Sequence, residues 1–99
     1  MAHFAKVEDG LVTNVIVIPN DKCGGGNFPD SEEVGQSFIK SLKLKGEWLQ
    51  TSYNKSFRKN FAGKGMIYDN VKDCFYNKKP NDGNSYTFDD ETATWQPTE

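Results

Sequence analysis

The stretch that decides the fold runs from Phe4 to Ile18 and reads FAKVEDGLVTNVIVI. Asp9-Gly10 separates two runs that are rich in β-forming residues. Asp-Gly is a favoured two-residue hairpin turn, because both central positions of that turn take positive φ. The stretch therefore predicts two antiparallel strands, over Phe4–Val7 and Val12–Ile18.

Within this hairpin, the alternation of side chains places Phe4 and Leu11 on a buried face. From Val15 to Ile18 the second run is apolar on both faces, which is typical of a central strand. Pro19 ends the run, since proline has no N–H to give to the neighbouring strand.

Residues 20–30 follow as a loop, because its three consecutive glycines do not hold regular structure cheaply. A helix over about 31–43 comes next, with Asp30 or Ser31 as its N-cap and Gly46 ending it. Apolar residues recur at helical spacing along one side of it. The residues expected to pack this helix on the sheet are Val34, Phe38 and Leu42.

The remainder predicts short strands, at 48–53, more weakly at 57–61, and in two hairpins. Each hairpin has an aromatic residue, then Asp, a polar turn and a second aromatic residue, seven positions after the first. The two copies are Tyr68–Phe75 and Phe88–Trp95. Aspartate accepts hydrogen bonds from turn N–H groups, and the aromatic residues pair across the strands.

Taken together, the elements predict one domain, residues 1–99, of the α+β class: mainly β, with antiparallel hairpins or a small sheet and one helix. A polar linker, 77–85, leads to a C-terminal hairpin, 86–97. The expectation is that Tyr68 and Phe75 fill the core. The interpretation of the second hairpin stays open between docking on the chain's own sheet and docking on a neighbouring subunit.

The net charge is −2, from 12 basic and 14 acidic residues mixed along the chain. This balance gives no electrostatic reason to bind nucleic acid or an anionic membrane, and the longest aliphatic run is too short to span a bilayer. Because no signal peptide precedes the domain, we expect a chain that begins near Met1 and works where it is made or assembled. Cys23 and Cys74 are then expected to be free thiols.

No constellation of catalytic residues is present. His3 is the only histidine and has no evident partner, and the two cysteines lack the spacing of a redox or zinc motif. The glycine stretches lack the lysine of a phosphate-binding loop, and residues 89–91 lack the ligand spacing of a calcium loop. The sequence predicts no catalytic residue, no cofactor and no metal, and hence a protein that is not an enzyme.

A local basic cluster surrounds Phe57 and Phe61. Basic residues between aromatic ones can bind single-stranded nucleic acid, but a strand with a solvated outer face has the same pattern. The overall charge favours the strand. The basic residues are Lys55, Arg58, Lys59 and Lys64.

Several motifs, in order along the chain, resemble a family of small proteins encoded by tailed phages of marine cyanobacteria. They are residues 1–17 (MAHFAKVEDGLVTNVIV), 48–54 (WLQTSYN), 58–65 (RKNFAGKG) running into Tyr68-Asp69, 73–75 (DCF) and 88–95 (FDDETATW). The chain departs from the family pattern after 54 and in its short linker, and residues 20–45 are expanded. The resemblance implies a virion-associated phage protein and supplies no catalytic residues.

These observations lead to an expected role as a minor structural protein of the virion, made in the host cytoplasm and then decorating the capsid or attached to the tail. Its expected partners are other phage structural proteins, with a homo-oligomer as one form. Trp95, Phe88 and Tyr86 are the candidate interface, since aromatic residues are over-represented at binding hot spots. A glycan-binding tail-fibre accessory, marked by exposed Trp or Tyr, and a small host-takeover protein are the alternatives.

Overall fold

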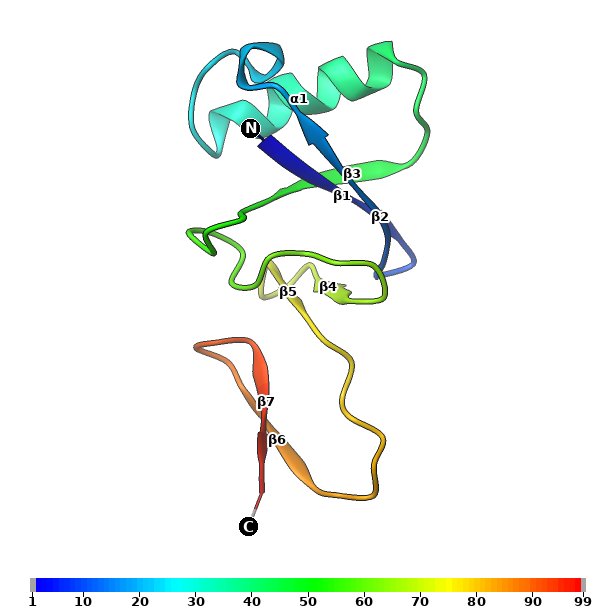
Figure 1. Ribbon diagram of the computed structural model, residues 1–99, viewed down its shortest axis with the longest axis vertical. Coiled ribbons are helices and arrows are strands. Elements are labelled where there is room, and N and C mark those ends of the chain that lie inside the picture. The colour runs from blue at the N-terminus through cyan, green and yellow to red at the C-terminus, as the bar shows by residue number, and fades with distance from the viewer. Residues whose placement is uncertain (1, 99) are drawn as a thin grey trace.

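The computed structural model describes residues 2–98 and confirms a mainly β, α+β fold with one α-helix among those residues (Figure 1). A short 3-10 helix, η1, adds one turn after the first hairpin. The elements are β1 (Ala2–Glu8), β2 (Leu11–Ile18), η1 (Asn20–Cys23), α1 (Asp30–Ser41), β3 (Glu47–Thr51), β4 (Ile67–Asp69), β5 (Cys74–Tyr76), β6 (Tyr86–Asp89) and β7 (Thr94–Pro97).

The predicted N-terminal hairpin is confirmed. β1 and β2 pair in antiparallel fashion, and Asp9 and Gly10 turn the chain with φ values of 51° and 80°. These are the positive angles that a two-residue turn between twisted strands needs. β2 ends at Ile18, directly before Pro19, as expected.

Replacing Gly10 with valine is expected to lower the free energy of unfolding by about 1 kcal/mol or more, because a β-branched residue resists positive φ. Gly10→Asn is the matched control, since asparagine tolerates the left-handed region. Urea unfolding measures both changes. Equal stability of the two variants would show that the turn does not require this backbone conformation.

The second run forms the middle strand of the sheet, as predicted. The five-stranded sheet has the order β3-β1-β2-β4-β5, but β2 meets β4 only at its start, through Leu11 and Ile67. Val15–Ile18 therefore pairs with β1 alone, and Val17 is half exposed. The prediction that Leu11 is buried is wrong, since it is 38% exposed. β1 is the strand that has a neighbour on both sides along most of its length.

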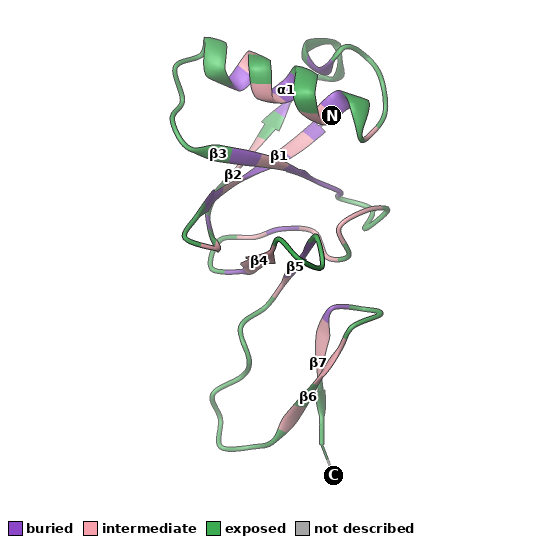
Figure 2. Ribbon diagram, turned by 180° about the vertical axis from the view of Figure 1, so that it is seen from behind, coloured by how far each residue is buried: buried purple, intermediate pink, exposed green. Residues whose placement is uncertain are grey.

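β1 is buried on both faces because it alternates between two hydrophobic clusters. Phe4, on the side of α1, belongs to the cluster that includes Ile18, Ile39 and Trp48. Ala5, on the opposite side, belongs to a second cluster; its other buried members are Val7, Val12, Ala62, Met66 and Phe75. α1 thus covers one face of the sheet, and the segment from 57 to 76 covers the other (Figures 1 and 2).

α1 packs on the sheet through a different stripe from the predicted one. Its buried residues are Ser31, Gly35 and Ile39, whereas Val34 and Leu42 are 43% and 52% exposed and Phe38 is only partly buried. The helix approaches the ring of Phe4 so closely that only glycine fits at position 35. The contact face was therefore set by small side chains, which a search for large apolar residues overlooks.

The ends of α1 also differ from the prediction. Pro29 occupies the N-cap position, and no side chain caps the helix. Ser31 instead donates to Gln50, 2.8 Å away on β3. The helix ends at Ser41, with Leu42 as its C-cap, before Gly46 is reached.

The weak strand predicted at 57–61 is not formed. Arg58 and Lys59 have φ values of 54° and 62°, which are incompatible with a strand. In place of a strand, the segment has one isolated β-bridge among the described residues, from Lys59 to Phe75 on β5. The turn at Arg58 and Lys59 directs the side chain of Arg58 toward the interior of the protein.

The second hairpin, β6–β7, forms a separate two-stranded sheet after the irregular linker 77–85. Every residue of that linker is exposed. The molecule measures 48 × 24 × 21 Å, and the hairpin occupies one end of its long axis (Figure 1). Figure 2 shows buried residues concentrated around β1 and β3 and mostly intermediate or exposed ones in the hairpin.

Candidate docking hairpin

The prediction that one hairpin unit is used twice is confirmed. In β4–β5, Oδ1 of Asp69 accepts hydrogen bonds from the N–H groups of residues 71 and 72, and Oδ1 of Asp89 accepts from residues 91 and 92. Each turn ends on a left-handed residue, Asp73 or Ala93. The aspartate therefore closes the same turn in both copies.

The two copies nevertheless have different surroundings. Phe75 of the first copy is fully buried, as predicted, and Tyr68 packs half-buried against the same cluster. The second copy pairs Phe88 with Trp95, with ring centroids 5.0 Å apart, in a sheet that has no third strand within the described residues. A two-stranded sheet is marginal in water, so the second copy needs support from elsewhere.

The three residues predicted as an interface lie on one face of the hairpin. Tyr86 and Phe88 are two residues apart on β6, and Phe88 is paired directly with Trp95. Alternation along antiparallel strands therefore sends all three side chains to the same side. All three are half-buried, and the opposite face carries the polar pair Thr87 and Gln96.

Part of this aromatic face rests on the chain itself. The ring of Tyr76 meets Phe88 edge-on at 4.9 Å and Trp95 at 6.5 Å. The indole N–H of Trp95 donates to the carbonyl of Asn77, 2.8 Å away. Support of the hairpin by the body of the protein is thus centred on the Phe88–Trp95 pair.

The turn of the hairpin is attached to the body as well. Nδ2 of Asn60 donates to the carbonyls of Phe75 and Ala93, at 2.9 and 2.8 Å, and so joins the two hairpins. Lys72 forms an ion pair with Asp90. Ala93 is consequently buried, although it lies in a surface turn.

At the far end of the hairpin, the contacts among the described residues are with the linker instead. There the hydroxyl of Tyr86 donates to Asp82, and the N–H of Thr98 donates to the carbonyl of Ser85. Both acceptors belong to the linker. Among the described residues, the turn of the hairpin is therefore bound to the body of the protein, whereas its open end is bound to the linker.

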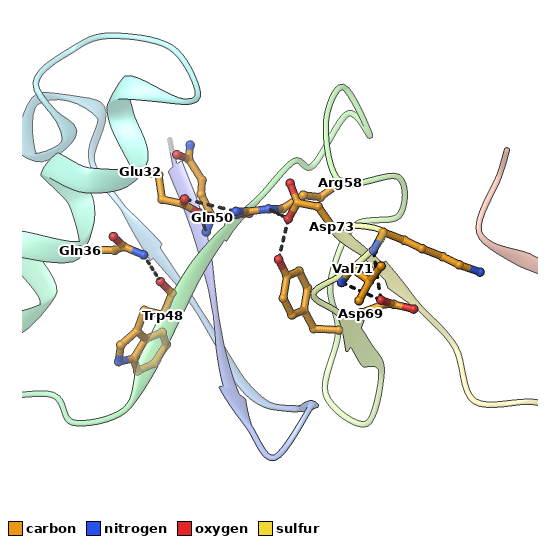
Figure 3. Close-up of polar contacts among 10 residues, drawn as sticks. Glu32, Gln36, Trp48, Gln50, Arg58, Asp69, Val71 and Asp73 are labelled. Carbon is orange, nitrogen blue, oxygen red and sulfur yellow. Dashed lines mark hydrogen bonds and ion pairs between the residues drawn. The ribbon is translucent and has the colours of Figure 1, made fainter. Parts of the chain in front are cut away.

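A charge network centred on the buried side chain of Arg58, which the sequence did not reveal, ties α1 to the β4–β5 hairpin (Figure 3). The guanidinium of Arg58 pairs with Glu32 on α1 and, at 2.8 Å, with Asp73 in the β4–β5 turn. It also donates to the carbonyl of Gln50 at 2.9 Å, and Gln50 donates its N–H to Glu32 at 2.8 Å. The side chain of Arg58 is only 8% exposed.

These contacts cover the outer edge of β3, where Nε2 of Gln36 also donates to the carbonyl of Trp48 (Figure 3). Side chains that occupy the polar groups of an edge strand keep it from pairing with another chain. The sequence pattern favoured a strand with Arg58 on its solvated face, and that interpretation does not signal an ion pair.

The network shifts the pKa values of its members. Burial alone would raise the pKa of Asp73, but hydrogen bonds from Tyr68 and Arg58 outweigh burial and lower it. Burial and the bond to Asp73 raise the pKa of Tyr68 to about 12. For Arg58, burial opposes the charge, but bonds to Glu32 and Asp73 raise its pKa. These shifts favour an ionised Asp73, a protonated Tyr68 and a charged Arg58 at neutral pH, which suits a structural role.

Of the other residues considered for chemistry, His3 and Cys23 line one cavity, which is described below, and Cys74 does not line it. His3 lies in β1 against the rings of Tyr53 and Phe61, and burial lowers its pKa. Cys23 and Cys74 are free and buried, and burial raises the pKa of both thiols. A raised pKa keeps a thiol protonated and poorly nucleophilic.

Arg58 does not belong to an exposed basic cluster, because its buried side chain pairs with Glu32 and Asp73. Lys55, Lys59 and Lys64 remain exposed. Within residues 2–98 no three His, Cys, Asp or Glu side chains gather as a metal site. The described chain also contains no helix with the length and apolar composition to cross a bilayer.

Comparisons of the chain with protein-family models, with curated proteins and with solved structures found no match. The candidate site that emerges is therefore the hairpin of residues 86–97, whose aromatic face is shared between the body of the protein and the surface.

Proposed function

We propose that the chain is a non-enzymatic structural protein of a tailed-phage particle, a minor capsid decoration or a tail-associated component. It docks on neighbouring phage structural subunits through the C-terminal hairpin. The resemblance of its motifs to small cyanophage proteins supports the phage setting. The observation that most supports docking is the hairpin itself, which forms a sheet separate from the five-stranded one and has a partly exposed aromatic face.

Two features of the hairpin suit docking. Phe88 and Trp95 are already held in place by Tyr76, so little side-chain freedom is lost when a partner covers them. Tyr86 extends the same face toward the unsupported end, where only the linker holds it. A partner placed there would supply the third strand, or the packing surface, that a two-stranded sheet needs for stability.

Replacing Trp95 with alanine tests this proposal. We expect the melting temperature of the isolated protein to change little, because Trp95 lies outside both hydrophobic clusters and its contacts with Tyr76 and Asn77 hold the hairpin and not the five-stranded sheet. We expect incorporation into particles to fall at least about tenfold, the effect of losing one interface anchor. The measurement is the amount of chain per purified particle, from cells that supply either the wild-type or the variant chain.

Gln96→Ala is the matched control, since it changes the same strand on its polar face. Gln96→Ala should be incorporated normally. A large fall in the melting temperature of the isolated Trp95→Ala protein would show that Trp95 is ordinary core, and the docking role of the hairpin would then be dropped.

A further inference from the structure

A cavity of about 520 Å³ opens on the part of the molecule away from the docking hairpin. Its walls come from the start of β1, the glycine loop after η1, and the segment from Gln50 to Phe57. That volume lies within the range of small-molecule binding pockets. No residue of β6 or β7 contributes to it, so the cavity is separate from the site proposed above.

The lining of the cavity is polar but uncharged. Charged residues make up 26% of the chain, yet no Asp, Glu, Lys or Arg side chain lines the cavity within the described residues. Hydroxyl and amide side chains, supplied by Ser, Thr, Asn and Gln, dominate together with aromatic rings. A phosphate or carboxylate ligand would call for Arg or Lys, and a metal ion for carboxylates. The lining instead fits a neutral ligand rich in hydroxyl groups.

The floor of the cavity collects the buried polar side chains of the protein. Within the described residues, the four buried polar residues all line it: Ser31, Gln50, Thr51 and Ser52. Burying polar groups is costly unless they are hydrogen-bonded, and each of these side chains has a partner within the chain. The cavity therefore has a polar wall whose groups are already fixed in position.

These groups are held in place and keep hydrogen-bonding capacity. The hydroxyl of Ser31 donates to Oε1 of Gln50, which leaves the Nε2 amide of Gln50 without an acceptor in the described chain. The hydroxyls of Ser52 and Ser56 lie 2.8 Å apart, and Ser52 also accepts from the N–H of Ser56. Each hydroxyl can both donate and accept, so the rigid floor still offers bonds to ligand hydroxyls.

An exposed aromatic ring stands at the rim. Tyr53 lines the cavity and is 69% exposed, although its ring is fixed by neighbours. It stacks on His3, with centroids 5.7 Å apart and planes at 25°, and meets Phe61 edge-on at 5.3 Å. A rigid, exposed ring beside polar groups offers an apolar face next to hydrogen-bonding partners.

We propose that this cavity binds a neutral saccharide. The ring of Tyr53 covers the apolar C–H face of a sugar, and the amide of Gln50 with the hydroxyls of Ser52 and Ser56 bonds its hydroxyl groups. A sugar presents both surfaces on one small molecule, which matches the pairing of an aromatic rim with an uncharged polar floor. This inference does not rest on a virion role or on docking by the hairpin.

The experiment follows the backbone amides of the ¹⁵N-labelled full chain by NMR. The probes are neutral monosaccharides at millimolar concentration, namely glucose, galactose, mannose, rhamnose, xylose and N-acetylglucosamine. Glucuronic acid and glucosamine serve as charged analogues. We expect at least one neutral sugar to cause saturable shifts confined to residues 23–31 and 50–57, and the charged analogues to bind more weakly.

Tyr53→Ala should weaken that binding at least about tenfold, because it removes the stacking surface. Ser56→Ala, at an exposed position, tests the polar floor and should weaken binding without unfolding the chain. Tyr86→Ala is the matched control and should bind the sugar as the wild type does, since it lies on the docking hairpin.

Three results would overturn the saccharide site. One is the absence of saturable shifts with the whole panel, and another is shifts that map outside the cavity. The third is unchanged binding by Tyr53→Ala. None of them bears on particle incorporation, so the failure of this inference and the failure of the docking role are distinguishable.

Discussion

Replacing Arg58 with methionine is expected to lower the free energy of unfolding by about 3 kcal/mol, because it leaves the partly buried carboxylate of Glu32 without its partner. Methionine keeps most of the buried aliphatic volume and removes the charge together with the N–H donors of the guanidinium. For a domain of this size, that loss corresponds to a fall in melting temperature on the order of 15 °C. Thermal and urea unfolding of the purified protein measure it.

Lys64→Met is the control for this variant, since Lys64 lies in the same segment but is exposed. It should change stability by no more than about 0.5 kcal/mol. The double variant Arg58→Met with Glu32→Gln should recover part of the loss, because no unpaired carboxylate remains. If Arg58→Met is as stable as Lys64→Met, the network does not hold α1 to the β4–β5 turn.

The network also predicts how stability depends on acid. In the folded chain the pKa of Asp73 lies below its ordinary value of 3.8. A carboxylate of this kind adds stability above its unfolded pKa, and that stability is lost as pH falls through the folded pKa. Because Arg58→Met removes one of the two hydrogen bonds that lower this pKa, the variant should lose less additional stability than the wild type over that acid range.

The second large effect is expected at Gly35, where a single methyl group should cost about 2 kcal/mol through overpacking. A Cβ atom at this position would lie 2.3 and 2.7 Å from two ring carbons of Phe4 and 3.0 Å from the sulfur of Cys23. Phe4 is fully buried and has no room to move aside. The cost therefore outweighs the gain of about 1 kcal/mol in helix propensity that alanine brings.

Gly26→Ala is the matched control for Gly35→Ala. Nothing lies within 4 Å of a Cβ at Gly26, and its φ is not in the left-handed region. That substitution should be neutral or slightly stabilising. Adding Phe4→Leu to Gly35→Ala should show coupling, because the smaller side chain makes room for the methyl group. Equal stability of the two alanine variants would contradict the close approach of α1 to β1.

Local signals predicted the local parts of this fold. Asp9-Gly10 determines its turn through two φ angles, and the aspartates at 69 and 89 close their turns through bonds two and three residues away. Such interactions are readable because all their partners lie within a few residues. The helix at 30–41 was found for the same reason.

Long-range contacts account for the errors. Arg58 turns inward because it pairs with Glu32, 26 residues earlier, and with Asp73, 15 residues later. The turn that brings Arg58 to these carboxylates takes the place of the expected strand. The packing stripe of α1 shifted because Phe4 requires a glycine opposite it. Neither partner can be recognised from the pattern around the residue itself.

The two candidate sites differ in the same way: the hairpin depends on local signals and the cavity on long-range contacts. Tyr86, Phe88 and Trp95 share a face because the short hairpin sets their alternation, which the sequence already implied. The cavity gathers residues from three distant segments, and no spacing in the sequence links Ser31 to Gln50 or Tyr53 to His3. Exposed tyrosine was expected as the mark of glycan binding, but its position beside an uncharged floor needed the structure.

The most direct test of the central claim, that the chain belongs to a phage particle, is quantitative mass spectrometry of particles purified from infected cells that make the chain. The proposed structural role predicts that the chain is present at a fixed number of copies per particle and stays bound after repeated density-gradient purification. Its absence from particles, with the chain abundant in infected cells, would contradict a virion role and favour a host-directed protein instead.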